Sequence, residues 1–282
     1  MGNIKKFIMR LPVINMIVLF CYRSFIGIRY LVNPLKWLVI LFFKSRETTN
    51  FTYNLTSTNK RYLASLFADI LGKSCDEIEG YIKELDIDVE LKVHISSRVS
   101  QCREKVNVDS EVRFCRRAGW YAIARATKPK IIVETGVDKG FGSCVLAAAL
   151  IRNTEEGFPG YYYGTDINPE AGFFFAGKYA NFGKILYGHS ITSLELLDEK
   201  IDLFINDSDH SADYEKREYE TISKKLSSTA IILGDNCIAT DKLLDLALET
   251  QRHFIFFNEM LEKHWYPGDG IGIAFRRNSC TT

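Results

Sequence analysis

From residue 130 onward, short apolar runs alternate with segments of helical spacing. This alternation is typical of parallel strands joined by crossover helices. The last two apolar runs are separated by a loop that contains Pro267, Gly268 and Gly270, which predicts an antiparallel hairpin that closes the sheet. The pattern therefore predicts an α/β fold with a seven-stranded sheet whose last strand is antiparallel. The expected strands are 131–134, 161–166, 184–187, 201–206, 230–234, 253–260 and 271–275.

The stretch 59–127 shows helical spacing without the alternation of a strand. Ser74 and Glu77 form an S-x-x-E capping box in front of an apolar run, which is a helix start signal. We expect three or four helices here. They either cap the following domain or serve substrate selection or homodimer formation, and the residues favour none of these roles.

An apolar segment, 7–43, opens the chain, and charges and prolines interrupt it. The interrupting residues are Arg10, Pro12, Arg23, Arg29, Pro34 and Lys36. Its longest uncharged run has 12 residues, whereas a membrane-spanning helix needs about 20. We therefore expect an interrupted helical element on the surface of an anionic membrane, with its basic and aromatic side chains at the headgroups. The alternatives are packing against the body or a second subunit, a signal peptide, and a true span.

Charge divides the chain into unequal parts. The 36 basic and 35 acidic residues nearly balance, but positions 1–46 hold eight basic residues and no acid. The remaining 28 basic residues stand against 35 acidic ones without a basic stripe, which argues against a nucleic acid partner. We expect a basic apolar head at 1–46, a helical cap region at 47–127 and a ligand-binding domain at 128–282.

The cysteines indicate the compartment. Seven of them are scattered without a C-x-x-C pair, so neither a zinc site nor a disulfide framework is indicated. We expect a cytoplasmic protein whose head is peripheral on the inner face of the membrane.

Residues that follow the expected strands suit a nucleoside ligand, because ligands in open α/β sheets bind at the carboxyl ends of the strands. Glu134, Gly136 and Gly140 follow the first strand with a spacing that differs from the G-x-G-x-x-G of nicotinamide cofactors. Asp166 ends the second strand, where an acid can accept hydrogen bonds from two ribose hydroxyls. Ser190 follows the third strand and either contacts an adenine edge or caps the next helix.

On these residues, the segment 128–276 resembles the class I S-adenosylmethionine-dependent methyltransferases. The resemblance implies a Rossmann-like methyltransferase sheet and makes 128–282 the domain that binds S-adenosylmethionine. The region of Tyr53, Asn59 and Trp120 is similar to the N-terminal part of a bacterial family of uncharacterised methyltransferases of this class. The cofactor residues implied by the resemblance are Glu134, Gly136, Gly140, Asp166, Ser190 and Asp207.

The fourth and fifth expected strands end in a cluster of acidic and polar side chains. Asp207, Asp209 and His210 follow the fourth strand, and Asp235 and Asn236 follow the fifth, about 4.8 Å away if the strands are neighbours. Carboxylates crowded at one sheet edge repel unless they are protonated or neutralised by a cation. Carboxylate and amide oxygens are ligands that suit Mg²⁺. The alternatives are that Asp209 caps the following helix and that Asn236 shapes a turn.

This cluster is similar to that of the metal-dependent catechol and caffeoyl-CoA O-methyltransferases. The resemblance implies that Asp207, Asp235 and Asn236 hold Mg²⁺, and it places His210 where those families have a catalytic Lys. The departure matters because a neutral His accepts a proton directly. We expect in-line attack of a substrate oxygen on the sulfonium methyl, with Mg²⁺ acidifying the hydroxyl and His210 taking its proton. The expected catalytic residues are His210 and Asp207. A metal-free reaction with His210 as the base is the alternative.

The predicted function is S-adenosylmethionine-dependent, metal-assisted O-methylation of a hydroxyl on a saccharide, a lipid-linked intermediate or a small molecule. One alternative is a non-catalytic binding or scaffold protein on the same fold. Another is a metal-independent N- or O-methyltransferase. An NAD-dependent oxidoreductase is disfavoured by the glycine spacing.

Overall fold

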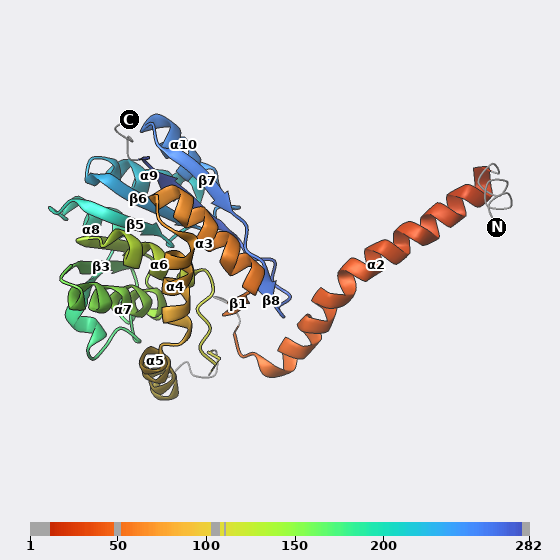
Figure 1. Cartoon of the computed structure of the whole chain (residues 1–282), viewed down its shortest axis with the longest axis horizontal. Helices are drawn as coiled ribbons and strands as arrows, with labels where there is room; N and C mark the ends of the chain where they lie inside the picture. The colour runs from red at the N-terminus through yellow and green to blue at the C-terminus, as the bar shows by residue number, and fades with distance from the viewer. Residues whose placement is uncertain (1–11, 48–51, 103–107, 110, 278–282) are drawn as a thin grey trace. The chain divides into compact units, whose positions relative to one another are not determined.

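The computed structural model describes residues 12–47, 52–102, 108–109 and 111–277. The chain divides into two compact units. The larger unit comprises Glu47–Glu262 and Pro267–Thr282, and the smaller comprises Met1–Arg46 and Lys263–Tyr266. Figure 1 labels the helices and strands that are used below.

A seven-stranded sheet forms the centre of the larger unit, in the order β4-β3-β2-β5-β6-β9-β7. All neighbouring strands pair in parallel except β9, which runs antiparallel to both β6 and β7. This order and the antiparallel last strand confirm the predicted fold class. The strands are β2 (Ile131–Thr135), β3 (Tyr161–Asp166), β4 (Gly183–Tyr187), β5 (Ile201–Asn206), β6 (Leu226–Asp235), β7 (His253–Phe257) and β9 (Ile271–Phe275).

Two strand ends differ from the expected ones by more than one residue. β6 begins at Leu226 rather than at 230, because the backbone of Leu226 already pairs with Ile201 although the residues that follow it are polar. β7 ends at Phe257 rather than at 260. The side chain of Asn59 donates to the Asn258 carbonyl at 3.1 Å and accepts from the Met260 N–H at 3.0 Å, which takes this backbone out of the sheet.

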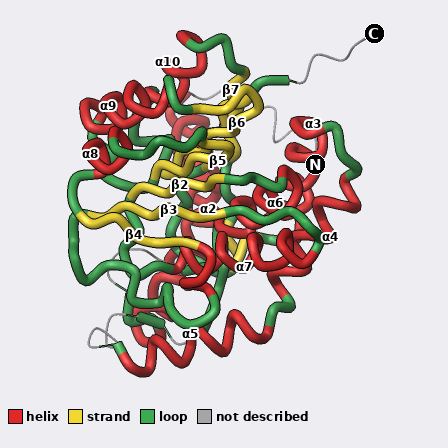
Figure 2. The backbone as a smooth tube through the Cα atoms, turned by 90° about the vertical axis from the view of Figure 1, so that its left-hand side faces the viewer, coloured by secondary structure: helices red, strands yellow, loops and turns green. Residues whose placement is uncertain are grey.

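Helices cover both faces of the sheet (Figure 2). α8, α9 and α10 pack against one another on one face, and α7 packs on the other face with helices that precede the sheet. Because both faces are covered, the inner strands are buried on both sides, and every residue of Ile271–Phe275 is buried. The helices that follow strands are α7 (Phe141–Glu155), α8 (Ser190–Glu195), α9 (Ala212–Ser223) and α10 (Lys242–Glu249).

In the described part of the larger unit, four helices precede the sheet, within the predicted three or four. Ser74 Oγ accepts the Glu77 N–H at 3.1 Å, so this half of the predicted capping box is confirmed. A two-residue strand, β1 (Asn54–Leu55), pairs with β8 (Leu261–Glu262) and ties the start of this region to the end of the unit. The four helices are α3 (Ser57–Leu71), α4 (Cys75–Asp86), α5 (Val89–Gln101) and α6 (Arg117–Thr127).

The described part of the head, 12–46, contains one helix, α2 (Pro12–Lys44), of 33 residues (Figure 1). The expected interruption at Pro34 is wrong, because the helix continues through it. An interior proline removes one backbone hydrogen bond, at a cost of about 3 kcal/mol, and the other turns of a long helix keep theirs. By length and composition Val13–Lys44 can cross a membrane. Its most apolar stretch of 18 residues has a mean hydropathy of 1.5 and is 0% buried. A signal sequence near an N-terminus can have the same length and composition.

Candidate active site

A cavity of about 520 Å³ lies at the carboxyl edge of the sheet, beside the loops that follow β2, β3, β4, β5 and β6. Most of the residues predicted for the site line this cavity, which brings together the ends of strands far apart in the sequence. The lining residues among them are Gly136, Asp166, Ser190, Asp207, His210 and Asn236. The predicted residues outside the lining are Glu134, Gly140 and Asp235.

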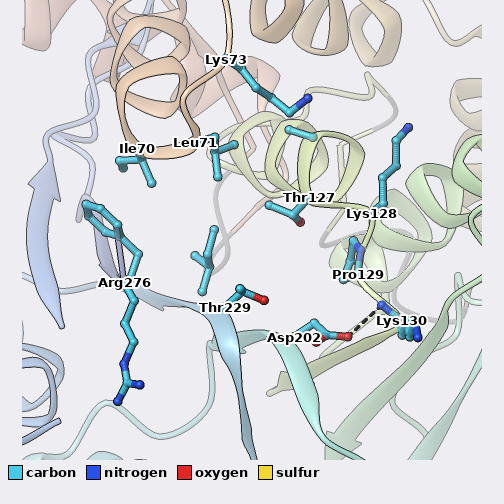
Figure 3. Close-up of a pocket in the computed structure, with 13 residues that line it drawn as sticks. Ile70, Leu71, Lys73, Thr127, Lys128, Pro129, Lys130, Asp202, Thr229 and Arg276 are labelled. Carbon is cyan, nitrogen blue, oxygen red and sulfur yellow. Dashed lines mark hydrogen bonds between the residues drawn. The ribbon is translucent and has the colours of Figure 1, made fainter. Parts of the chain in front are cut away.

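Another cavity, of about 470 Å³, lies at the opposite edge of the sheet, where β2 and β5 begin (Figure 3). Its basic side chains do not converge, since Arg276 points away from Lys73 and Lys128. Lys73 is ion-paired with Glu77, and Lys128 with Glu156. None of the predicted site residues lines this cavity. We therefore assign the functional site to the carboxyl edge of the sheet.

The turn after β2 requires glycine at Gly136. Its φ is +83°, and a Cβ atom there would lie 1.9 Å from the backbone oxygen of Asp207. Any other residue would be strained by the positive φ. Its clash with Asp207 could not be relieved by moving a side chain, because the Asp207 oxygen belongs to the backbone. The close approach of two strand ends, β2 and β5, therefore depends on this one residue. Gly140 precedes α7 at φ +88° and supports the turn from outside the cavity lining.

The Asp166 carboxylate lies on the cavity wall in a fixed orientation. Its Oδ2 accepts the Asp138 N–H and its Oδ1 accepts the Asn168 N–H, both at 2.8 Å. Each carboxylate oxygen has a further lone pair, so both can still accept a hydrogen bond from a ligand. The geometry suits a pair of neighbouring hydroxyl groups.

Glu134 points into the protein. Its carboxylate accepts hydrogen bonds from Tyr162 Oη and from Ser143 Oγ, and the residue is 1% exposed. Burial raises the pKa of Glu134 to about 7, against the opposing effect of the Tyr162 hydrogen bond. Its predicted contact with a cofactor stays a prediction, because the side chain does not line the cavity.

Ser190 is the first residue of α8, so the alternative in which it caps this helix is wrong. Its Oγ donates to Glu218 and lies 2.9 Å from Tyr214 Oη, although the residue also lines the cavity. The buried Glu218 accepts further hydrogen bonds from Asn206 Nδ2 and from Ser208 Oγ, the latter at 2.8 Å. One carboxylate on α9 therefore fixes residues that follow β4 and β5.

His210, Asp207 and Asp235 come together as the sequence predicts. One ligand atom from each lies within 4.8 Å of the others. Burial raises the pKa of Asp207 and of Asp235, which is fully buried, and a nearby arginine opposes both changes. Asp209 accepts the Ser211 N–H at 2.8 Å and so stabilises the turn before α9.

The imidazole of His210 has three polar neighbours, two at Nε2 and one at Nδ1. Its Nε2 lies 2.8 Å from Asn236 Nδ2 and 3.8 Å from Asp207 Oδ1. On the other side of the ring, Nδ1 lies 3.6 Å from Oε1 of the buried Glu215. Asn236 adopts a left-handed backbone conformation, φ +51°, so it also shapes the turn after β6. With its proton on Nδ1, which faces Glu215, the imidazole accepts the hydrogen bond of Asn236 Nδ2 at Nε2.

Two arginines that the sequence analysis missed complete the cluster. Arg116 contacts Asp235 Oδ1 through Nε and lies 3.7 Å from Asp207 Oδ1 through Nη2. Arg117 lines the cavity, and its Nη2 lies 4.0 Å from Asp207 Oδ2. Both stand at the start of α6, where an Arg-Arg pair has no sequence signature that would connect it with strands β5 and β6.

These positions bear on the predicted magnesium ion. The oxygens of Asp207 and Asp235 are suitable donors, but Arg116 already contacts both carboxylates. A divalent cation on Asp235 would share that carboxylate with a buried guanidinium and be repelled by it. With Arg116 in this position, Asp207 and Asp235 do not fit Mg²⁺. The magnesium ion therefore stays a prediction.

The sheet order, the glycine turn after β2 and the acid after β3 define the class I S-adenosylmethionine-dependent methyltransferase fold. Residues 133–237 match the family described as a methyltransferase domain. The matched segment and the sheet order agree with the methyltransferase fold that the sequence resemblance predicted. No curated protein sequence matches the chain.

Solved structures agree on the fold. The S-adenosylhomocysteine-bound methyltransferase PaMTH1 of Podospora anserina is 17% identical, with a TM-score of 0.50 over 68% of this chain and 89% of that one. A candidate O-methyltransferase from Klebsiella pneumoniae is 14% identical, with a TM-score of 0.50 over 70% of this chain and 94% of that one. At these identities the likeness concerns the fold alone.

Proposed function

We propose that the chain transfers a methyl group from S-adenosylmethionine to a hydroxyl oxygen of an acceptor, with His210 as the general base. The observation that carries this proposal is the His210 ring on the wall of the cavity, with Nε2 beside Asp207 and Nδ1 beside a buried carboxylate. A cofactor-binding fold with a positioned base beside its cavity suits methyl transfer to a protic acceptor.

The cofactor residues follow from what each side chain on the cavity wall offers. Asp166 accepts hydrogen bonds from the ribose hydroxyls, and Gly136 lets the backbone approach the ligand. Ser190 lies at the adenine end. Arg117 supplies a cation on the cavity wall, which suits the carboxylate of the methionine moiety. The S-adenosylhomocysteine bound to the Podospora anserina methyltransferase supports this ligand class.

In the reaction, the acceptor oxygen attacks the methyl carbon of the sulfonium in line with the breaking S–C bond. The electron pair of that bond goes to sulfur, which leaves S-adenosylhomocysteine. His210 Nε2 takes the hydroxyl proton after the acceptor hydroxyl has replaced Asn236 Nδ2 as its hydrogen-bond donor. The Glu215 carboxylate, 3.6 Å from Nδ1, stabilises the imidazolium that forms. Removing such a base typically costs about 10²- to 10⁴-fold in rate. No step requires the predicted Mg²⁺.

The acceptor class follows from the same base. His210 can deprotonate a hydroxyl of a saccharide, of a lipid-linked intermediate or of a small molecule, and we propose these as the acceptors. Nitrogen is a second candidate, since Asp207 can bind a protonated amine and His210 beside it can remove the proton that leaves the nitrogen lone pair free to attack.

Transfer of isotope-labelled methyl from S-adenosylmethionine to a panel of catechol, sugar and isoprenoid-linked sugar acceptors tests the proposal. We expect O-methylated product, a turnover that falls about 10²- to 10⁴-fold in His210→Ala, and S-adenosylmethionine affinity that stays within about threefold. His253→Ala is the matched control, because this exposed histidine lies on the edge strand β7. Transfer only to amine acceptors would contradict O-methylation, and full activity in His210→Ala would contradict the role of the base.

We also propose that the head attaches the protein to the cytoplasmic face of a membrane. Supporting this, α2 has an unbroken length of about 50 Å at 1.5 Å per residue, more than the roughly 30 Å hydrocarbon core. Its large apolar side chains are exposed, including Phe42 and Phe43 at 79% and 81%. Positions 1–46 carry basic residues and no acid, which suits anionic lipids.

Flotation of the full-length chain with phosphatidylserine-containing vesicles tests the attachment. We expect co-flotation that a variant lacking 1–44 loses while it keeps its S-adenosylmethionine affinity. Resistance of the bound protein to alkaline carbonate extraction would mean that α2 spans the membrane, and release would mean that it lies on the surface. A full-length chain that stays with the aqueous fraction as a dimer would contradict membrane attachment and favour packing between subunits.

A further inference from the structure

We propose that Arg116 supplies, from within the chain, the positive charge for which the sequence resemblance predicted Mg²⁺, so that this site needs no divalent metal ion. This inference rests on the proposed function, because the methyl transfer is the reaction that Arg116 would support. The contacts that favour it are those of Arg116 with Asp207 and Asp235.

The guanidinium lies where an ion between the carboxylates would lie. Arg116 Nε contacts Asp235 Oδ1, and Nη2 of the same side chain lies 3.7 Å from Asp207 Oδ1. These are the carboxylates that the resemblance assigned to the metal. Arg117 approaches only Asp207, at 4.0 Å. Among the residues that the structure describes, Arg116 is the one cation that reaches both carboxylates.

Arg116 is held in a polar pocket of its own, unlike a surface arginine that could swing away. Its side chain is 8% exposed, and Nη1 donates to Tyr53 Oη at 3.4 Å. Tyr53 Oη in turn donates to Oε1 of the buried Glu259 at 2.8 Å. Glu259 is fixed by the Gly270 N–H, 3.2 Å from its Oε2. Withdrawing the guanidinium would break contacts to three segments of the chain.

The buried carboxyl group of Asp235 has two polar neighbours, the guanidinium of Arg116 and the carboxyl group of Asp207. In the part of the chain that the structure describes, neither of its oxygens accepts a hydrogen bond, and its side chain is 0% exposed. A buried carboxylate without donors or a counter-ion is costly. Arg116 lowers this cost because its positive charge lies against Asp235.

A hydrated ion has no comparable place. Mg²⁺ takes octahedral ligands at about 2.0–2.1 Å and usually keeps several waters. Asp235 does not line the cavity, so water bound to such an ion would have to occupy the space that Arg116 fills. The geometry therefore favours the resident guanidinium over the ion.

Arg116 acts on the reaction as a positioning residue. It does not line the cavity, but it neutralises Asp207, whose Oδ1 lies 3.8 Å from His210 Nε2. With that charge balanced, Asp207 can stay beside the imidazole without a metal ion to hold it. Removing the guanidinium frees both carboxylates for another cation.

Binding of Mn²⁺, measured by electron paramagnetic resonance and by thermal shift, tests the inference. We expect no saturable Mn²⁺ site in the wild-type chain at about 1 mM, a range in which a functional Mg²⁺-type site is occupied. Arg116→Met should gain a site that binds Mn²⁺ at least about tenfold more tightly than wild type does, because Asp207 and Asp235 are then uncompensated. Added Mn²⁺ should raise the melting temperature of this variant alone.

Three control variants distinguish the loss of the Arg116 charge from destabilisation of the fold. Arg116→Met combined with Asp235→Asn should lose the acquired site. Arg252→Met removes another buried arginine, one that donates to the Ala230 carbonyl and pairs with no carboxylate among the described residues, so it should gain no site. Arg116→Lys keeps the charge and should also gain none. If Arg116→Met does not fold, the wild-type chain compared with Asp235→Asn still tests the inference.

A saturable Mn²⁺ site in the wild-type chain that Asp235→Asn abolishes would overturn the inference. So would a folded Arg116→Met variant without a new site. These outcomes do not depend on S-adenosylmethionine, whereas failure of the wild-type chain to bind S-adenosylmethionine would overturn the proposed function and leave the cation result standing. Turnover, once an acceptor is identified, should be unchanged by EDTA.

Discussion

Replacement of Glu134 by Gln isolates the consequence of burying a carboxyl group next to the turn after β2. The side chain is 1% exposed and faces Tyr162 and Ser143, and burial raises its pKa to about 7 from 4.5. The folded chain therefore keeps this proton up to about pH 7, whereas the unfolded chain releases it near pH 4.5.

The sign and size of the effect follow from this difference. A pKa raised in the folded state contributes stability that is complete below pH 4.5 and is lost as the pH rises to about 7. At about 1.4 kcal/mol for each pH unit, the loss is about 3 kcal/mol. The Gln side chain of Glu134→Gln does not ionise, so the variant does not lose this stability. Between pH 4.5 and pH 7.5 the free energy of unfolding of wild type should therefore fall by about 3 kcal/mol relative to that of the variant.

Urea unfolding followed by circular dichroism at pH 4.5, 6.0 and 7.5 measures the difference between the two chains. If the two stability curves run parallel over this range, Glu134 is not a buried acid with a raised pKa. The same variant tests the predicted contact with the cofactor, because a side chain outside the cavity lining should change the S-adenosylmethionine affinity by less than about threefold. A loss of about a hundredfold would mean that Glu134 reaches the ligand.

Two further substitutions test the turn and the cap. Gly136→Ala places a Cβ atom 1.9 Å from the Asp207 backbone oxygen at a φ of +83°, so we expect at least about 3 kcal/mol of lost stability and at least about tenfold weaker S-adenosylmethionine binding, by urea unfolding and calorimetry. Wild-type affinity in this variant would contradict the close approach of β2 and β5. Ser74→Ala removes the acceptor of the Glu77 N–H and should cost about 1 kcal/mol in urea unfolding without a change in S-adenosylmethionine affinity, and an unchanged midpoint would contradict the cap.

The sheet was predictable because its inner strands are buried on both faces. Such strands are continuous apolar runs, and the polar residue that ends each run marks the functional edge, as Asp166 and Asp207 do. The ends of β6 and β7 were less predictable. Leu226 pairs through its backbone ahead of polar side chains, and the turn after Phe257 is set by Asn59, a residue distant in the sequence.

The site was only partly predictable, because its charge balance depends on the folded chain. Asp207, Asp235 and His210 follow adjacent strands and could be placed together from the pattern. Arg116 reaches them from the start of α6, and no periodicity or motif connects that position with β6. Glu134, the expected end of β2, is the residue before its observed end, and its side chain faces Tyr162 on the neighbouring strand β3.

Calorimetric titration of S-adenosylmethionine into the full-length chain, with and without EDTA, tests the central claim most directly. We expect one site per chain in both conditions and at least about tenfold weaker binding in Asp166→Ala, which removes the carboxylate that faces the cavity. Asp202→Ala, at the opposite edge of the sheet, is the matched control and should leave the affinity unchanged. Absence of binding at millimolar S-adenosylmethionine, or equal affinity in Asp166→Ala, would contradict the assignment of this cavity as the methyl donor site.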